Sequence, residues 1–292
     1  MYQQSLFHRD LSWESSAQVL AVRWNGFQPE LVCTIDSDDE IRRFSFSSDL
    51  EFEVDTGKHC IGTWEDGKHV PCPVNARVTR FSCCDSCAQE TIPDQRCIFE
   101  PRCQGDSCLV NGRLGESIPF CSRPHSLYLA NYHDRMKIGM TASDRISDRL
   151  IEQGADAYIR IATTENRFDA REMEKALSRK HGIRQSFNAM EILRMTTVRI
   201  DQSTLHRESR GLIMKMMADD IKPALPLTIL DNYPIILPLR SVPKETSTSG
   251  LHIGKTIGMK GRFLYYDHGG PRALNLGDLP SRTIRFNPSS FL

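Results

Sequence analysis

Cysteines gather in one segment of the sequence, at spacings that suit a metal site. Seven of the ten cysteines lie between residues 83 and 121, among Pro, Asp and Gly and without helical or strand periodicity. A segment of this kind cannot build an apolar core, so another interaction must hold it together. Cys84 and Cys87 form a Cys-x-x-Cys pair, whose two thiolates can bind one tetrahedral ion if a later pair completes the site.

The predicted ion is zinc, because thiolates in a reducing compartment favour metal binding over disulfides. The first choice of ligands is Cys84, Cys87, Cys103 and Cys108, which would make a closed, structural Zn²⁺ site. The set stays open, since further candidates lie nearby, namely Cys83, Cys97, Cys121 and His125. Inert reduced thiols, or a redox pair at Cys84 and Cys87, are the competing interpretations.

A second group of polar residues lies where the sequence predicts a regular α/β unit, residues 122–200. Apolar runs at 127–130 and 136–140 flank a polar break, which is typical of a β-hairpin. A helix then ends before Gly154, a strand covers 157–163, and a second helix ends before Gly182. Asp169 and Glu172 have the spacing of a capping box at the start of that second helix. The predicted order is strand, strand, helix, strand, helix.

The flanking regions are predicted to be rich in β-structure. Residues 1–80 alternate apolar and polar side chains, as in 50–54, and residues 201–292 combine one helix with later strands. The predicted domains are therefore 1–80, the cysteine-rich segment 81–121, the core 122–200 and a C-terminal region 201–292. Residues 250–256 imitate a phosphate-binding loop, but the glycine spacing is one residue short and a strand pattern follows, so nucleotide binding is not expected there.

Four stretches of this sequence resemble an uncharacterised bacterial and archaeal family. They are CIFEPRCQGDSC, HSLYLANYHDRMKIGMTASDRISDRLIEQGA, NRFDAREMEKAL and GKTIGMKGRFLYY, and they run in this order from about residue 83 to 275. The resemblance implies an α+β fold with a zinc-ribbon-like segment, a core similar to the GIY-YIG nucleases and flanking β-rich domains. It also implies cleavage of phosphodiesters, in DNA or RNA.

The same resemblance assigns roles to individual residues. Ser126-Leu127-Tyr128 stands at the position of the GIY motif and Lys137-Ile138-Gly139 at that of the YIG motif. Tyr128, Lys137, Arg149 and Glu174 would be the catalytic residues. A tyrosine or a neighbouring base activates water, an arginine neutralises charge on the phosphate oxygens, and a carboxylate holds Mg²⁺ or Mn²⁺.

Further residues would contact the substrate, namely His125, Gly139, Arg145 and Asn188. Two positions depart from the nuclease pattern: Lys137 replaces a tyrosine, and Gln153 stands where histidine or tyrosine is common. A glutamine cannot act as a general base, whereas a lysine can contact phosphate or lower the pKa of a nearby phenol. Taken singly, Tyr128 can also be a core aromatic and Arg149 a solvated ion-pair partner, so only their combined order indicates function.

Composition and charge indicate which kinds of partner the protein can have, but they say little about its activity. The net charge is zero, with 39% hydrophobic and 25% charged residues, as in ordinary soluble proteins. No apolar run is long enough for a membrane span or a signal peptide, so a cytoplasmic location without membrane contact is expected. Acidic residues outnumber Lys and Arg in 1–80, and the reverse holds in 122–200. The leading hypothesis is a metal-dependent nuclease; the alternatives are a non-catalytic zinc-containing nucleic-acid-binding protein and a scaffold recruited for small-molecule chemistry.

Overall fold

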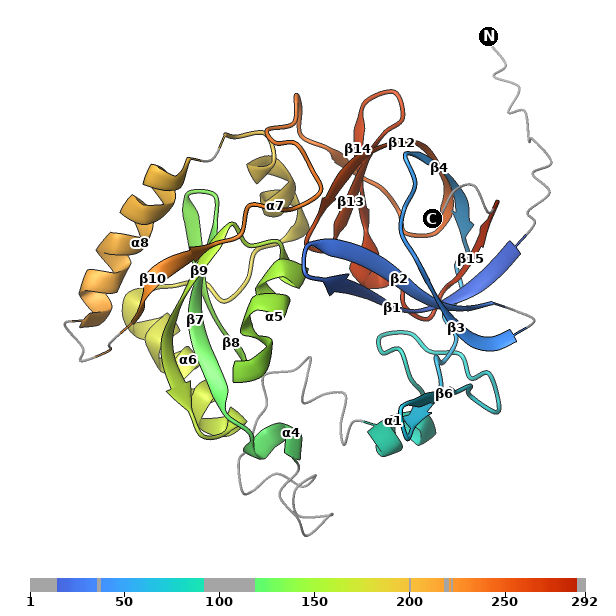
Figure 1. Ribbon diagram of the computed structural model, residues 1–292, viewed down its shortest axis with the longest axis horizontal. Coiled ribbons are helices and arrows are strands. Elements are labelled where there is room, and N and C mark those ends of the chain that lie inside the picture. The colour runs from blue at the N-terminus through green and yellow to red at the C-terminus, as the bar shows by residue number, and fades with distance from the viewer. Residues whose placement is uncertain are drawn as a thin grey trace.

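Strands from both ends of the chain pair in one large sheet. The computed structural model describes residues 15–35, 38–91, 119–199, 201–217, 221 and 223–287. In this part of the chain the sheet has nine strands in the order β11-β14-β13-β12-β4-β15-β1-β2-β3. Their bounds are β1 (Ser15–Asn25), β2 (Gln28–Ile35), β3 (Asp38–Phe44), β4 (Asp49–Val54), β11 (Lys244–Glu245), β12 (Gly250–Lys260), β13 (Phe263–Asp267), β14 (Pro271–Asn275) and β15 (Thr283–Phe286). Figure 1 shows the blue N-terminal and red C-terminal strands together on the right.

This pairing joins two regions that the sequence divides. Strand β4 pairs antiparallel with β12, where Phe52 lies opposite His252, and with β15, where Val54 lies opposite Ile284. The strands of residues 1–80 and those near the C-terminus therefore form one sheet, not two separate β domains. Alternation of apolar and polar residues indicates a strand and its buried face, but it does not specify a partner that lies far away in sequence.

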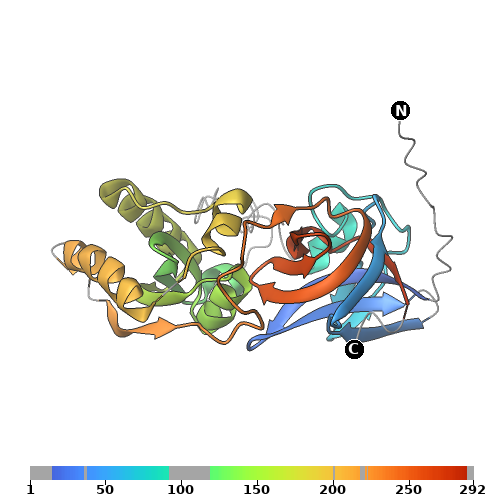
Figure 2. The same cartoon turned by 90° about the horizontal axis from the view of Figure 1, so that it is seen from above.

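A second sheet carries the α/β unit. Its four strands follow the order β10-β9-β7-β8, with bounds β7 (His125–Tyr132), β8 (Arg135–Ala142), β9 (Ala157–Thr164) and β10 (Ala224–Ile229). The helices around it are α4 (Pro119–Ser122), α5 (Ile146–Gln153), α6 (Arg167–His181), α7 (Ala189–Met195) and α8 (Gln202–Met217), and a 3₁₀ turn, η2 (Ser143–Arg145), precedes α5. The predicted order of strand, strand, helix, strand and helix is confirmed, as is the mixed α+β class. Figures 1 and 2 show this sheet and its helices beside the large sheet.

The ends of two helices fix where their side chains point. Gly154 and Gly182 adopt left-handed conformations after α5 and α6, with φ of 77° and 64°, as their predicted roles as helix stops require. The start of α6 differs from the prediction. Asn166 is its N-cap and accepts a 2.9 Å hydrogen bond from the Asp169 N–H, so the capping box predicted for Asp169 and Glu172 is wrong by one turn. An asparagine side chain caps a helix as well as an aspartate does, and here it comes three residues earlier.

Strand β12 is irregular near Gly258. Its pairing with β13 shifts register between Thr256 and Gly258, and Gly258 has a φ of 152°. A Cβ atom at Gly258 would lie 2.2 Å from the Pro234 carbonyl oxygen, so the close approach of that loop requires glycine. Residues 250–256 lie within this strand, which agrees with setting aside a phosphate-binding loop there.

The two sheets share one apolar core. They also touch at a close contact between the end of α5 and the turn after β12, which we call the joint. A Cβ atom at Gly154 would lie 3.1 Å from the Gly261 Cα atom, which shows how closely the two backbones pass. The Tyr233 hydroxyl donates a 2.9 Å hydrogen bond to the Ala155 carbonyl oxygen. Beside it, Asp156 and Lys260 form an ion pair whose side chains are about nine-tenths buried. These contacts set the position of α5 relative to the large sheet.

A small third unit follows β4 in sequence. It contains the two-stranded sheet of β5 (Thr63–Glu65) and β6 (Lys68–Val70), followed by helix α1 (Asp85–Thr91). One further 3₁₀ turn, η3 (Leu276–Asp278), lies between β14 and β15. In the described part of the chain, no helix has the length and apolar character of a membrane span.

Candidate functional site

A cleft on the second sheet brings together the residues that the sequence assigns to catalysis. Tyr128 comes from β7, Lys137 and Gly139 from β8, Arg149 from α5 and Glu174 from α6. The cleft has a volume of about 620 Å³, and His125 and Arg145 also line it. The elements that contribute these side chains all belong to the predicted α/β core. Residues that are far apart in the sequence therefore meet in one cleft.

Asn188 lies away from this cleft. It is the exposed N-cap of α7, where its side-chain oxygen accepts a 2.8 Å hydrogen bond from the Glu191 N–H. The Glu191 carboxylate accepts in return from the Asn188 N–H, which completes a capping box. This contact accounts for the asparagine without a substrate, whereas the nearby Ser186 does line the cleft.

Gly139 is required by the tyrosine opposite it. Tyr128 and Gly139 are paired across β7 and β8, and the phenol ring lies over the glycine. A Cβ atom at Gly139 would lie 2.5 Å from the Tyr128 hydroxyl oxygen, a distance that real side chains do not reach. The glycine of the second motif therefore makes room for the tyrosine of the first.

The Gly139→Ala substitution is expected to displace the Tyr128 ring and to lower the free energy of unfolding by about 2 kcal/mol, as overpacked cores do. Gly211→Ala is the matched control, because Gly211 lies in α8 and the space that its added methyl group would occupy is open. That control should raise stability by up to about 1 kcal/mol through helix propensity. Urea unfolding of the three proteins measures both effects, and equal stability of Gly139→Ala and the parent would contradict the tight fit.

Gln153 is the hydrogen-bond centre of the cleft floor. Its side-chain oxygen accepts from the Lys137 ammonium at 2.6 Å, from the Tyr132 hydroxyl at 3.3 Å and from the Tyr128 hydroxyl at 3.5 Å. The sequence pattern placed Gln153 among the departures from a nuclease, because it cannot act as a base. The structure gives it a different role, since one amide oxygen fixes three side chains that come from both strands of the hairpin.

Burial changes the pKa values of both strand residues in the floor. Tyr128 is only 2% exposed, and its burial raises the pKa to about 12, although the nearby charge of Arg149 acts in the opposite direction. Burial also lowers the pKa of Lys137 to about 8, with Arg149 and Arg262 contributing and Glu174 opposing. The phenol therefore keeps its proton at neutral pH, whereas the amine loses its proton just above it.

Glu174 is the acidic residue of the cleft, and it is almost fully buried. It is 3% exposed, and Arg171 donates a hydrogen bond to its Oε2 atom. Burial raises the pKa of Glu174, while the nearby charges of Arg171, Lys137 and Arg167 lower it. The neighbouring glutamate, Glu172, lies on the exposed face of α6 and pairs with Lys175 at 2.8 Å. The structure thus favours Glu174 over Glu172 as a site residue.

Three arginines in the cleft were not predicted from the sequence. Arg123 precedes β7, and Arg167 and Arg171 lie on α6. The spacing of 167, 171 and 174 places these side chains on one face of a helix, a signal that becomes visible once the helix is known to start after Asn166. Together with Lys137, Arg145 and Arg149, the described lining holds six cationic side chains and the single carboxylate of Glu174. Such a surface suits phosphate groups.

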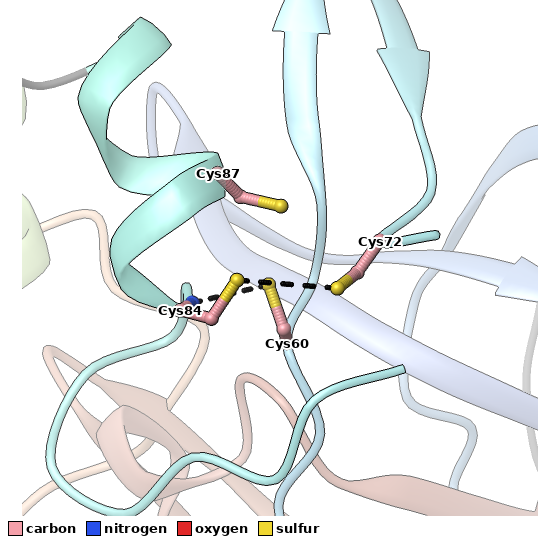
Figure 3. Close-up of side chains that lie close together, drawn as sticks. All are labelled: Cys60, Cys72, Cys84 and Cys87. Atoms are coloured by element: carbon pink, nitrogen blue, oxygen red, sulfur yellow. Dashed lines mark hydrogen bonds between the residues drawn. The ribbon is translucent and has the colours of Figure 1, made fainter. Parts of the chain in front are cut away.

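The cysteines form a second candidate site, in the small unit. Cys60, Cys72, Cys84 and Cys87 place their sulfur atoms within 4.8 Å of one another (Figure 3). Cys84 and Cys87 belong to the predicted set. Cys60 and Cys72 do not, and the predicted Cys103 and Cys108 lie outside the described residues. The Glu65-Asp66-Gly67 turn could have indicated Cys60 and Cys72 as ligands. It connects β5 and β6 in a hairpin, and a hairpin brings the residues before its first strand close to those after its second.

The geometry of the four cysteines suits a tetrahedral ion such as zinc. Sulfur atoms around a tetrahedral zinc ion are about 3.8 Å apart, as follows from Zn–S bonds of about 2.3 Å. The Cys72 and Cys84 sulfurs lie 4.0 Å apart, too far for a disulfide, and the N–H groups of Gly62 and Cys84 point at the Cys60 sulfur at 3.4 and 3.1 Å. These donors stabilise a thiolate, which is the form that binds metal. Four protein ligands leave no open position, as in structural sites.

A comparison with known families places the chain. The family model described as "Protein of unknown function (DUF2797)" matches residues 47–282, which is most of the sequence. The chain belongs to the DUF2797 family. No match was found among the curated proteins or among the solved structures.

The DUF2797 match includes both candidate sites. It begins just before β4, so it contains Cys60, Cys72, Cys84 and Cys87 as well as every residue that lines the cleft. Strands β1 to β3 precede it, although they belong to the same large sheet. The DUF2797 match thus contains the cysteine group and the cleft, together with the paired strands β4 and β12, whereas β15 follows it.

Proposed function

We propose that the cleft is the active site of a GIY-YIG-like, metal-dependent phosphodiesterase that acts on DNA or RNA. The observation that carries this proposal is the convergence of Tyr128, Lys137, Arg149 and Glu174 on one cleft. Four residues from four separate elements meet in the order that the nuclease pattern requires. The six cations around them supply the charge that a phosphodiester needs for binding.

Each residue has a defined part in such a reaction. Arg149 is about half exposed at the mouth of the cleft, where its guanidinium can contact a phosphate and stabilise charge that grows on the phosphate oxygens. Glu152 pairs with both Arg145 and Arg149, at 2.7 and 3.5 Å, and so holds the two arginines together. Lys137 orients or deprotonates the attacking water, and Tyr128 donates its hydroxyl proton in a hydrogen bond.

The Glu174 carboxylate fits a divalent ion. Carboxylate oxygens are the ligands that Mg²⁺ and Mn²⁺ prefer, and the Arg171 hydrogen bond uses Oε2, which leaves Oε1 for a cation. When bound, such an ion supplies charge stabilisation at the leaving oxygen. The raised pKa of Glu174 means that ligation strengthens as pH rises through that value, because only the ionised carboxylate binds the cation.

A non-catalytic nucleic-acid-binding module is the second candidate. The observation that favours it is the Arg171–Glu174 ion pair, which already neutralises the single described carboxylate of the cleft. In that case the arginines would hold phosphates without hydrolysis, and affinity would fall steeply with salt.

Cleavage assays separate the two candidates. Labelled single-stranded and double-stranded DNA and RNA are incubated with the purified protein and Mg²⁺ or Mn²⁺. Arg149→Ala and Glu174→Gln are each expected to reduce cleavage by about 100-fold or more, as the loss of one charge-stabilising group does. Exposed neighbours on α6 provide matched controls: Glu172→Gln and Arg179→Ala should retain parental cleavage.

The outcomes are distinct. Metal-dependent cleavage lost in both cleft variants and retained in both controls supports the enzyme. Salt-sensitive binding without cleavage by the parent protein, weakened by Arg149→Ala and unaffected by Glu174→Gln, supports the binding module and contradicts the phosphodiesterase.

A further inference from the structure

The amine of Lys137 has unusual surroundings for a lysine in a cleft. Its hydrogen-bond partner is the neutral amide oxygen of Gln153, at 2.6 Å, and it lies 5.1 Å from the centre of the Tyr132 ring. No carboxylate among the described residues forms an ion pair with it. The side chain nevertheless lines the cleft, so a bound molecule can reach the nitrogen.

The charged groups that act on Lys137 come from three parts of the chain. Arg149 approaches from α5 and Arg262 from the turn between β12 and β13, and both disfavour a second positive charge. Glu174 on α6 acts in the opposite direction. Burial is the largest effect, and the net result is a pKa of about 8. A hydrogen bond donated to an amide oxygen uses one N–H, which leaves the lone pair of the neutral amine free to attack.

A lysine held next to other cations and away from water is a nucleophile for carbonyl carbons. The same cleft is lined by arginines that suit phosphates, so a fitting molecule carries an aldehyde flanked by phosphate groups. The ring-opened sugar of a nucleic-acid strand that has lost a base has this chemistry, with a phosphate on either side of the aldehyde-bearing sugar.

We propose that Lys137 forms a Schiff base with the aldehyde of an abasic site in DNA and that the cleft cleaves the strand on its 3′ side by elimination. The binding of the flanking phosphates rests on the proposed function of the cleft. The reaction itself is independent of it, because strand cleavage by elimination needs no divalent ion and no attack of water on the phosphorus atom.

The reaction balances without a further reagent. The neutral Lys137 nitrogen adds to the sugar C1′ atom and a C–N bond forms. The carbonyl oxygen leaves as water with one proton from the amine and one from solvent, which gives an iminium ion, and the solvent proton is returned when the iminium is hydrolysed. A base, for which Glu174 is the candidate in the cleft, takes a proton from C2′. The C–H electrons form the C2′–C3′ double bond, and the C3′–O bond breaks with its electron pair going to the phosphate. Water then hydrolyses the iminium, releases the unsaturated aldehyde and restores the amine.

Borohydride trapping tests the proposal with the full-length protein. The probe is a labelled DNA duplex with one abasic site, made by enzymatic removal of uracil, and no Mg²⁺ or Mn²⁺ is added. Cyanoborohydride should reduce the iminium to a stable protein–DNA adduct, and peptide mass mapping should locate it at Lys137. A duplex with a tetrahydrofuran residue at the same position is the matched probe, because it lacks the aldehyde and should give no adduct.

Three variants separate chemistry from charge and folding. Lys137→Arg keeps a cation but cannot form the iminium, and it should reduce trapping by about 100-fold. Lys175→Arg makes the same exchange at a lysine on the exposed side of α6 and should leave trapping unchanged. Gln153→Glu gives Lys137 a carboxylate partner in nearly the same shape, so the pH midpoint of trapping should move upward by about 1 to 3 units.

The pH dependence of the trapping rate, and not the rate alone, therefore tests whether Gln153 positions Lys137. In the parent protein the trapping rate should rise with pH through about 8, since only the neutral amine attacks. Absence of an adduct, an adduct mapped to another amine, or equal trapping by Lys137→Arg would overturn the proposal. Trapping that persists when intact DNA is not cleaved with Mg²⁺ would reject the phosphodiesterase and retain the lyase, and the reverse pattern would do the opposite.

Discussion

We expect the Cys60→Ser variant to bind no zinc and, as a result, to lose the fold of the small unit. The Cys60 sulfur lies within the four-cysteine group and accepts two N–H hydrogen bonds, from Gly62 and Cys84. A serine hydroxyl is a poor zinc ligand at neutral pH, and three thiolates hold the ion far less tightly than four. Because structural zinc binding contributes about 10 kcal/mol or more to small metal-held folds, its loss is expected to unfold residues around β5, β6 and α1.

Metal analysis and limited proteolysis measure this result. The parent protein, purified without chelator, should carry about one equivalent of zinc, and Cys60→Ser less than about one tenth. The matched control is Cys33→Ala. Cys33 is buried in β2, where burial raises the pKa of its thiol to about 12, so it stays a neutral thiol outside the cluster. This variant should keep its zinc, and only Cys60→Ser should gain new cleavage sites around β5, β6 and α1.

A further pair of variants decides between the two ligand sets. Cys103→Ser and Cys108→Ser remove the ligands first predicted from the sequence, and with the four-cysteine group intact they should retain zinc. Loss of zinc in these two, together with full zinc in Cys60→Ser, would show that the group in the structure is not the metal site.

The cleft could be predicted from the sequence because its residues are tied to local patterns. Tyr128 and Gly139 lie in the two strands of one hairpin, and Arg149 lies on the helix that follows directly. The hairpin pairing and the helix stop at Gly154 fix their relative positions over short distances in the chain. Glu174 needed one further choice, between neighbouring glutamates, and the spacing from Arg167 and Arg171 on one helix face would have supported it.

The features that sequence reasoning missed depend on pairing over long distances. Cys60 and Cys72 meet Cys84 only because the β5–β6 hairpin folds back onto α1, and a Cys-x-x-Cys pattern marks just one half of such a site. The join of β4 with β12 depends on which buried faces fit together. Gln153 was set aside because its side chain cannot take part in proton transfer, yet its importance comes from three donors that converge on one oxygen.

The joint between the two sheets is where substitution of a single charge should be most costly. Asp156 accepts hydrogen bonds from the Lys260 ammonium and, at 2.6 Å, from the His133 N–H. Both side chains of the Asp156–Lys260 pair are about nine-tenths buried, and the ammonium also lies 5.3 Å from the centre of the Tyr233 ring. Gln153 is only three residues before Asp156, so this pair also supports the end of α5 that forms the cleft floor.

Asp156→Asn is expected to lower the free energy of unfolding by about 3 kcal/mol, because it leaves the Lys260 charge buried without a counter-ion. The asparagine oxygen still accepts from the His133 N–H, so the loss reports the ion pair and not the backbone contact. Lys260→Met should cost a similar amount by leaving the carboxylate unpaired. The double variant Asp156→Asn with Lys260→Met removes both charges and should be more stable than the sum of the two losses predicts by about 2 kcal/mol.

Urea unfolding of the four proteins gives this coupling free energy directly. If the two single losses of unfolding free energy are strictly additive, the two charges do not interact. The joint would then be held by apolar contacts alone. Cooperative loss has a consequence for the cleft as well. If the pair anchors the end of α5, cleavage and trapping by the single variants should decline at temperatures below the main unfolding transition, since Gln153 then loses its support before the sheets separate.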